Sequence, residues 1–160
     1  MHEIEIRNAA RDDLAEIVEM LREFAAFEKL EEYCTVTEKR LETAAFGPDA
    51  IIEVIVAKQG NRTIGYAIYY PNFTSFGGLS GYYLEDLYVR EGVRGRGIGE
   101  SLLREVARAA LARGFERIDF EVLKWNEKAI HFYERLGAES NEDNRHFKFA
   151  GIAFDRLGSE

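Results

Sequence analysis

The segment Arg94-Gly-Arg-Gly-Ile-Gly99 decides the fold, because of what stands on either side of it. The run before it, Tyr82-Tyr-Leu-Glu-Asp-Leu-Tyr-Val89, is apolar and β-prone, and the run after it, residues 100–111, is helical in pattern. A strand, a glycine loop and a helix N-terminus form an anion cradle, since glycine lets the backbone approach a ligand and the first N–H groups of a helix lack intrahelical partners. The segment therefore predicts a site for a phosphate-containing ligand.

Spacing excludes two familiar phosphate-binding loops. A P-loop needs a lysine and a hydroxyl residue directly after Gly-x4-Gly, but Gly92 and Gly97 are followed by Ile98 and Gly99. The dinucleotide fingerprint fails because Glu100 stands where its third glycine is required. The remaining pattern is Arg-x-x-Gly-x-Gly, which taken alone is also compatible with an ordinary strand-to-helix turn.

A second motif follows a predicted strand at residues 117–123. It reads Trp125-Asn-Glu-Lys-Ala-Ile-His-Phe-Tyr-Glu-Arg-Leu-Gly137. Asn126 is placed as an N-cap and Gly137 as the glycine that ends the helix. Apolar residues recur between them at helical spacing, so one face of the helix is apolar. Tyr133 on this helix has two interpretations, a core aromatic or a functional hydroxyl.

The two motifs of this chain can be written as Arg-x-x-Gly-x-Gly and Asn-x-x-Ala-x-x-Phe-Tyr-x-x-x-Gly. In this order they resemble the motifs of the GNAT superfamily of N-acetyltransferases. Tyr83-Leu-Glu-Asp86 and Trp125-Asn-Glu127 resemble its diamine (spermidine/spermine) and thialysine N-acetyltransferase branch. The resemblance covers nearly the whole chain. It implies an α/β (α+β) GNAT fold: a mixed central sheet with an antiparallel front, a β-α-β coenzyme A core and helices on both faces.

The resemblance also implies the site residues. Glu85 corresponds to the general base, acting through water, and Tyr133 to the acid that protonates the departing thiolate. A backbone N–H within residues 87–89 is expected to stabilise the oxyanion. Acetyl-CoA would be held by a set in and beside the motifs: Leu87, Tyr88, Val89, Arg94, Gly95, Arg96, Gly97, Ile98, Gly99 and Asn126. The acceptor amine would meet four side chains: Glu28, Phe76, Glu85 and Asp86.

A carboxylate beside the acceptor has a physical purpose. A primary amine with the pKa of lysine is almost wholly protonated at pH 7, and forming the neutral nucleophile costs about 4 to 5 kcal/mol. Glu85 and Asp86 are neighbours in a predicted strand, so we expect their side chains on opposite faces, with one of them in the cleft. For Asp86, a salt bridge or an edge charge is an equal alternative.

The chain departs from the branch in one loop. The diamine enzymes have an acid and a tryptophan before the Tyr-Leu-Glu-Asp strand, whereas residues 71–80 contain no carboxylate and offer only Phe76 for the tryptophan. A long polyamine would lose an anchor for its distal ammonium. We therefore expect short diamines and lysine-like amines to match or exceed spermine as acceptors. Glu142 and Asp143 are candidates for a distal acid.

Bulk composition fits one folded domain over residues 1–160, since 46% of the chain is hydrophobic and only two residues are proline. A net charge of −8 disfavours nucleic acid and suits a cationic substrate. The single cysteine, Cys34, permits no internal disulfide, and no signal peptide or membrane-spanning run is recognisable, so we expect a cytoplasmic protein with no membrane partner. The histidines and Cys34 lack metal-ligand spacing, so no metal is expected.

Three functions compete. The favoured one transfers acetyl from acetyl-CoA to a small primary amine; the others are acetylation of a protein or peptide amine, and a coenzyme A-binding regulatory module without catalysis. Intact Glu85 and Tyr133 argue against the last. The resemblance implies a two-fold homodimer in which acids such as Glu28 act across the interface.

The remaining patterns predict further elements. Strands are expected at residues 2–7, 51–58, 63–70, 82–90, 117–123 and 145–149. Helices are expected from the cap Asp12 through Phe24, from Thr35 or Thr37, from Glu100 to Ala112, and from Asn126 to Leu136.

Overall fold

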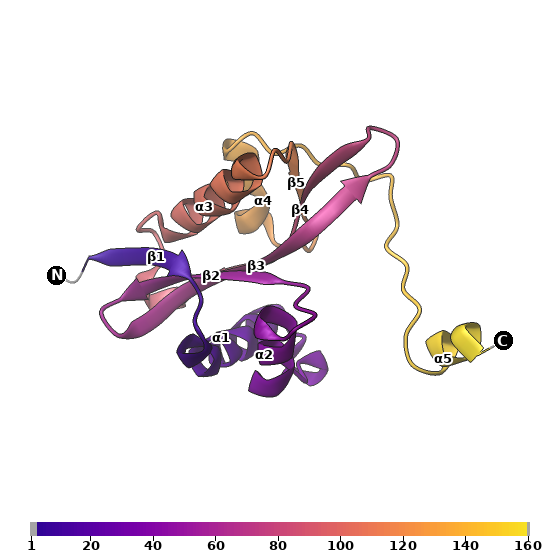
Figure 1. Ribbon diagram of the computed structural model, residues 1–160. Coiled ribbons are helices and arrows are strands. Elements are labelled where there is room, and N and C mark those ends of the chain that lie inside the picture. Colours follow the sequence, from indigo (N-terminus) through magenta and orange to yellow (C-terminus); the bar gives the residue numbers. More distant parts are fainter. Residues whose placement is uncertain (1–2, 160) are drawn as a thin grey trace. The chain divides into compact units, whose positions relative to one another are not determined.

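The computed structural model describes residues 3–159, and the chain divides into two compact units, Met1–Glu121 and Val122–Glu160. The first unit contains an open sheet in the order β1-β2-β3-β4-β5 (Figure 1). Its first three pairs are antiparallel, and β4 and β5 are parallel. The strands are β1 Ile4–Asn8, β2 Glu53–Gln59, β3 Arg62–Thr74, β4 Leu79–Val89 and β5 Arg117–Asp119.

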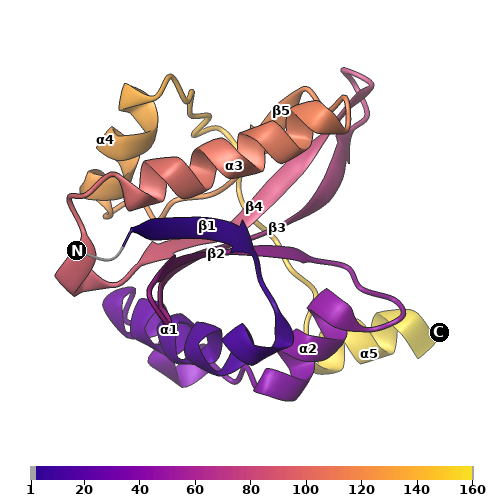
Figure 2. The same ribbon diagram turned by 60° about the vertical axis from the view of Figure 1, so that its left-hand side comes forward.

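Helices cover both faces of this sheet (Figures 1 and 2). On one face α1 (Leu14–Phe27) and α2 (Glu38–Phe46) bury a core cluster that includes Val56 and Tyr66. On the other face α3 (Ile98–Ala112) buries a second cluster. We call these the α1 face and the α3 face. Short 3-10 turns complete the unit at η1 Arg11–Asp13, η2 Glu31–Tyr33 and η3 Glu91–Val93. The expected mixed sheet, antiparallel front and β4-α3-β5 unit are confirmed.

The parallel pairing of β4 with β5 is short. It runs only from Gly81 opposite Arg117 to Tyr83 opposite Asp119, while β4 continues to Val89. The predicted strand at residues 117–123 was therefore too long, since a segment is a strand only where a neighbour pairs with its backbone. Beyond Tyr83 one edge of β4 has no ladder partner among the described residues.

The β3–β4 hairpin is longer than expected. The prediction ended one strand at Tyr70 and began the next at Tyr82, but pairing continues to Thr74 opposite Leu79. Residues 75–78 form a tight turn in which Gly78 has a φ of 62°. The segment expected to be a loop at residues 71–80 is therefore mostly strand.

The N-terminal elements follow the predictions with small shifts at their ends. Asp13, rather than Asp12, immediately precedes α1, because residues 11–13 form a 3-10 turn. Thr37 caps α2 by accepting a hydrogen bond from the Arg40 N–H at 3.2 Å. His2, at the start of the predicted first strand, lies outside the described residues.

The second unit contains α4 (Glu127–Arg135) and α5 (Ile152–Ser159). Asn126 caps α4 by accepting from the Ala129 N–H at 3.2 Å, and Gly137 follows it with a φ of 94°, as predicted. The predicted strand at residues 145–149 was wrong, because this segment is irregular and no strand of the described chain pairs with it. Helix α5 was not predicted. No helix within residues 3–159 is both long and apolar enough to cross a membrane.

Candidate functional site

The glycine loop leads from β4 through η3 into α3. Gly95 and Gly97 have φ values of 78° and 73°, which is the left-handed region, and a methyl group added to either would meet no atom within 4 Å. Gly97 is the N-cap of α3, so the N–H groups of Ile98 and Gly99 have no partner inside the helix. The loop is therefore an open backbone concavity at a helix N-terminus, which fits an anionic group.

Arg94 ties this loop to the rest of the first unit. Its Nε donates to the Val89 carbonyl at 2.8 Å, and its guanidinium lies 5.4 Å from the ring centroids of both Phe27 and Tyr88. The side chains of Ile98 and Tyr88 are buried in the core. Ile98 and Tyr88 were both predicted to contact the cofactor, and only their backbone atoms are therefore available to a ligand.

A β-bulge lies in the middle of β4. In the β3–β4 register Ile68 is opposite Asp86 and Tyr69 is opposite Leu84, so Glu85 is an extra residue without a partner. On either side of it, Leu84 and Leu87 both pack on the α3 face. Leu84 and Leu87 therefore share a face although two residues lie between them. Those two residues, Glu85 and Asp86, both belong to the opposite, α1 face. The expectation of opposite faces was wrong, because strict alternation holds only in an unbulged strand.

Asp86 has an unusual electrostatic environment. The Tyr66 hydroxyl approaches its Oδ2 at 3.5 Å, and no lysine or arginine pairs with it in the described chain. Burial, followed by the negative charges of Glu85 and Glu28, raises the pKa of Asp86 to about 7. Glu28, at the C-cap of α1, also has a raised pKa because of burial. The structure thus brings three predicted carboxylates, Glu28, Glu85 and Asp86, close together.

Aromatic side chains border this group. Glu85 is exposed, and the Tyr70 hydroxyl donates to its Oε2 at 3.4 Å. The Tyr70 ring stacks on Tyr83, with centroids 5.3 Å apart and an interplanar angle of 26°. Sequence reasoning missed Tyr66, Tyr70 and Tyr83. The sequence did contain a signal for two of them. Tyr66 and Tyr70 are an even number of residues apart in one strand, so their side chains lie on the same face.

Other predicted residues lie apart from these carboxylates or in the second unit. Phe76 is fully exposed in the hairpin turn, at 108% of its reference area. Tyr133 lies on α4 with its ring edge-on to Phe132 at 5.0 Å, and Asn126 uses its side-chain oxygen as the helix cap. Glu142 and Asp143 lie in the irregular segment after α4. Their functional roles stay predictions.

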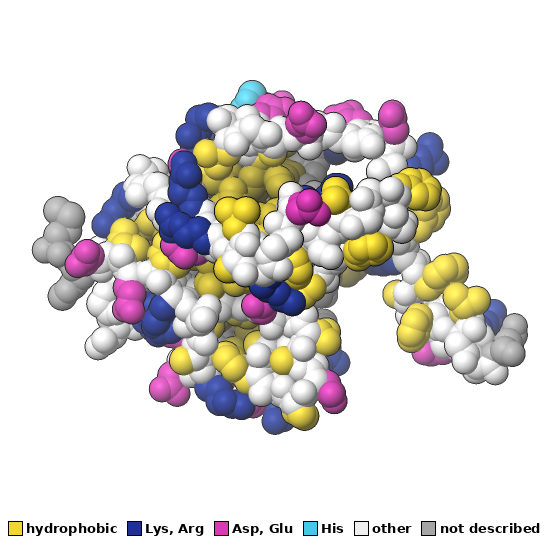
Figure 3. Space-filling view, turned by 45° about the horizontal axis from the view of Figure 1, so that its top comes forward, with side chains coloured by type: hydrophobic (Ala, Val, Ile, Leu, Met, Phe, Trp, Pro, Cys, Tyr) yellow, Lys and Arg dark blue, Asp and Glu magenta, His cyan; other side chains and the backbone are white. Residues whose placement is uncertain are grey.

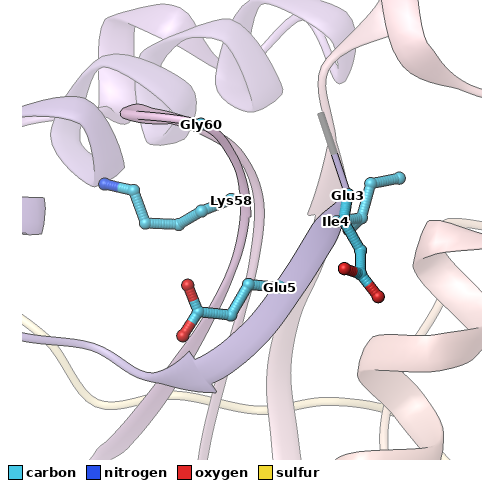
Figure 4. A pocket seen from close by; sticks show the side chains of 5 residues that line it. All are labelled: Glu3, Ile4, Glu5, Lys58 and Gly60. Atoms are coloured by element: carbon cyan, nitrogen blue, oxygen red, sulfur yellow. The ribbon is translucent and has the colours of Figure 1, made fainter. Parts of the chain in front are cut away.

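A surface hollow at the β1 edge is unrelated to these residues (Figure 4). It is lined by Glu3, Ile4, Glu5, Lys58 and Gly60. The Lys58 ammonium is engaged in an ion pair with Asp13 at 2.8 Å. The described residues contain no group of three or more side chains placed to hold a metal ion. Basic and acidic side chains are intermixed over the face that Figure 3 shows.

Comparisons with known proteins agree with the fold. An integron cassette protein from the mobile metagenome of V. cholerae has a similar structure, with a TM-score of 0.80, 23% identity and 98% of each chain covered. The chain is 35% identical to the thialysine N-epsilon-acetyltransferase of Mus musculus, over 95% of each protein. It is 36% identical to the L-ornithine N5-acetyltransferase of Arabidopsis thaliana over 70% of this chain and 46% of that protein.

A family model described as "Acetyltransferase (GNAT) family" matches residues 14–138. This match covers the glycine loop, the bulged strand and the helix that carries Tyr133. The chain therefore belongs to the GNAT acetyltransferase family, whose members depend on acetyl-CoA.

Proposed function

We propose that this protein transfers the acetyl group of acetyl-CoA to a primary amine of a small cationic molecule, such as a diamine, a polyamine or a lysine-like compound. The observation that carries the proposal is the bulge in β4, which puts Glu85 and Asp86 on one face beside Glu28. Such a group of carboxylates attracts an ammonium group. The names of the relatives, which act on thialysine and ornithine, support the same class of acceptor.

The residues present fit the cosubstrate. Gly95 and Gly97 leave open space at the N-terminus of α3 for the pyrophosphate, together with the backbone of Arg94, Arg96 and Gly99. The backbone of residues 87–89 continues past the end of the β4–β5 pairing. Alternate N–H groups of an antiparallel strand face its open edge, so those of Leu87 and Val89 are offered to a carbonyl oxygen, while that of Tyr88 faces β3. Acetyl-CoA supplies the thioester carbon that the neutral amine attacks.

Each step of the acetyl transfer is then assigned to a residue. Glu85 takes the proton of the substrate ammonium, through water, and Asp86 and Glu28 hold the cation nearby. The new N–C bond forms as the C–S bond breaks, and Tyr133 donates its proton to the thiolate. The nitrogen is positively charged after the attack and loses its second proton to the tyrosinate, and Glu85 passes the first proton to solvent. The products are then a neutral amide, a thiol and both residues in their starting state.

We propose a cytoplasmic homodimer with no nucleic-acid or membrane partner. Cys34 is the only cysteine and is a free thiol, which suits a reducing compartment. Around Glu28 the chain exposes three large apolar side chains, Phe27 at 42%, Leu30 at 39% and Tyr33 at 71%, which a second subunit would cover. Light scattering should give twice 18.3 kDa, and a monomer at micromolar concentration would contradict the dimer.

A thiol-release assay tests the activity with a panel of diamines, polyamines, lysine analogues and amino-terminal peptides. Tyr133→Phe should lower kcat by roughly 10²-fold with little change in acetyl-CoA affinity by calorimetry. Glu85→Gln should lower kcat/KM on a similar scale, whereas the control Glu91→Gln, an exposed acid of η3, should not. Acetylation of peptides alone would contradict the proposed acceptor class, and full activity of Tyr133→Phe would return that tyrosine to a packing role.

A further inference from the structure

Helix α1 is anchored more firmly at its start than at its end. Its buried residues all lie in the first two turns: Leu14, Ile17, Val18 and Met20. Further along, Phe24 packs only partly against the same core cluster, and Phe27, the last residue of the helix, is 42% exposed. The terminal turn therefore has less core burial to hold it, and it leads directly into the C-cap Glu28, the predicted acceptor acid.

Arg94 of the glycine loop meets that terminal turn. Its guanidinium lies 5.4 Å from the ring centroids of both Phe27 and Tyr88, and Tyr88 stacks on Phe24 with centroids 5.2 Å apart. Arg94 Nε also donates to the Val89 carbonyl at 2.8 Å. A guanidinium over aromatic faces makes an attractive contact with a defined geometry. The cofactor loop and the end of α1 therefore touch through the Arg94 side chain.

The position of the terminal turn sets the place of Glu28. The charge of Glu28 helps to raise the pKa of Asp86, after burial and Glu85, so the end of α1 lies close to the candidate acceptor site. The next residue, Lys29, has a φ of 58°, which is strained for a residue with a side chain. A helix end with strain and little core burial has low local stability. The contact with Arg94 therefore affects how often Glu28 is in place.

The other side of this contact belongs to a loop that a cofactor would order. Residues 92–99 include four glycines, and Gly95 and Gly97 are exposed. Glycine has more backbone freedom than any other residue, so this loop has much freedom to lose when its N–H groups bind an anion. A bound pyrophosphate would fix the backbone next to Arg94 and, with it, the guanidinium over Phe27.

We propose that Arg94 and Phe27 are positioning residues that couple the two halves of the site. When coenzyme A fixes the glycine loop, Arg94 holds the last turn of α1, and Glu28 is already in place for the amine. The second ligand then has less to order, which gives positive cooperativity without a large structural change. Linkage makes the effect reciprocal, so the amine strengthens coenzyme A binding by the same factor. The inference rests on the proposed function for the role of Glu28 as an acceptor acid.

A second helix end in the same unit offers a matched control. Helix α2 also ends at a phenylalanine, Phe46, whose ring centroid lies 5.2 Å from the guanidinium of Arg11. The N–H groups that follow the two phenylalanines, those of Glu28 and Gly47, each donate to the carbonyl four residues earlier, at 3.0 and 3.1 Å. Arg11 belongs to η1 and not to the glycine loop, so the end of α2 should not respond to coenzyme A.

Amide hydrogen exchange followed by NMR tests the coupling with saturating coenzyme A and no amine. Coenzyme A should slow exchange of the hydrogen-bonded Glu28 and Leu30 N–H groups about two- to fivefold, the range of one exposed cation–π contact. The Gly47 N–H should not change. The slowing should persist in Phe27→Tyr, which keeps the ring. It should disappear in Phe27→Leu and in Arg94→Lys, which keeps the charge but not the planar group.

The control variant and the amine complete the test. In Phe46→Leu, which removes the corresponding contact of α2, the response of the Glu28 N–H should be intact. Calorimetry with 1,4-diaminobutane then measures the coupling to an amine. Bound coenzyme A should tighten binding of the diamine by the same factor in the unmodified protein and in Phe27→Tyr, but not in Phe27→Leu.

The outcomes keep the coupling and the activity apart. Coenzyme A that binds without slowing exchange at Glu28, or that slows it equally in Phe27→Leu, would overturn the coupling even if amines are acetylated. Equal slowing at Gly47 would overturn it too, because the ligand would then stabilise the whole unit. So would equal diamine affinity with and without coenzyme A. If no amine binds or releases thiol although exchange at Glu28 responds as expected, the proposed function fails instead.

Discussion

Asp13 and Asp86 are both shielded carboxylates on the α1 side of the sheet, yet their surroundings are opposite. Asp13 is 1% exposed and accepts from Arg7 at 2.7 Å, Lys58 at 2.8 Å and the Ala10 N–H at 2.8 Å. Burial alone would raise its pKa, but these partners hold the pKa well below its usual range. Asp86 has a tyrosine hydroxyl and two further acids instead, and its pKa rises to about 7.

The difference separates a structural acid from a site acid. A buried carboxylate with two cations and a backbone donor is fully satisfied, so it holds β1, α1 and β2 together and offers nothing to a ligand. A buried carboxylate among like charges is unfavourable until a proton or a cation arrives. The protein tolerates this cost at Asp86, next to the candidate base, which is what an ammonium-binding site requires.

The largest expected effect is at the satisfied acid. Asp13→Asn removes the charge that Arg7 and Lys58 share, and we expect it to lower the free energy of unfolding at pH 7 by about 3 kcal/mol, as for broken buried ion pairs. Urea unfolding measures this change. The control Glu42→Gln breaks an exposed pair with Arg11 and should leave the free energy of unfolding almost unchanged.

The pH dependence gives a second view of Asp13. Since its pKa is lower in the folded state, its stabilisation is present above the unfolded value near pH 4 and is lost as pH falls through the folded value. The difference between the unmodified protein and Asp13→Asn should therefore shrink in acid. A loss no greater than that of Glu42→Gln at pH 7 would contradict the comparison.

Asp86→Asn should act in the opposite direction on stability. The folded protein binds a proton at Asp86 more tightly than the unfolded chain, so stability decreases as pH rises from about 4 to 7. The amide removes this cost, and we expect a gain of about 2 kcal/mol above pH 7, less than the full shift implies because water still reaches the side chain. Thermal unfolding at pH 4, 6 and 8 tests it. A loss of stability at pH 8, or a gain independent of pH, would refute the assignment.

Local sequence signals predicted much of this arrangement, because they act through nearby residues. Asn126 and Gly137 mark helix ends by capping and backbone conformation, and the structure confirms both places, whereas α3 begins at Ile98, two residues before the predicted start. The order of the two motifs was enough to indicate the β4-α3-β5 unit. Such features need no knowledge of the partner strands.

What the sequence could not predict depends on pairing between distant segments. The bulge at Glu85 exists only in the register of β4 against β3, so simple alternation along β4 predicted opposite faces for Glu85 and Asp86, which in fact share one face. Residues 145–149 have a strand-like pattern, but no strand of the described chain pairs with them.

The smallest predicted effect concerns the hydroxyl donor beside Asp86. Tyr66→Phe keeps the buried ring and removes the hydroxyl that approaches Asp86 at 3.5 Å. That hydrogen bond lowers the pKa of Asp86 against burial and the neighbouring acids, so its loss should raise the pKa further. The pH range over which stability decreases should then extend upward, which unfolding measured in steps from pH 6 to 9 would detect. Tyr88→Phe is the matched control, because its hydroxyl donates to Glu23 at 3.2 Å and its ring also lies in the core of the α1 face. If both variants move this pH range equally, or Tyr66→Phe moves it downward, the Tyr66 hydroxyl does not stabilise the charged form of Asp86. Burial and the two neighbouring glutamates alone then account for the difference between Asp86 and Asp13.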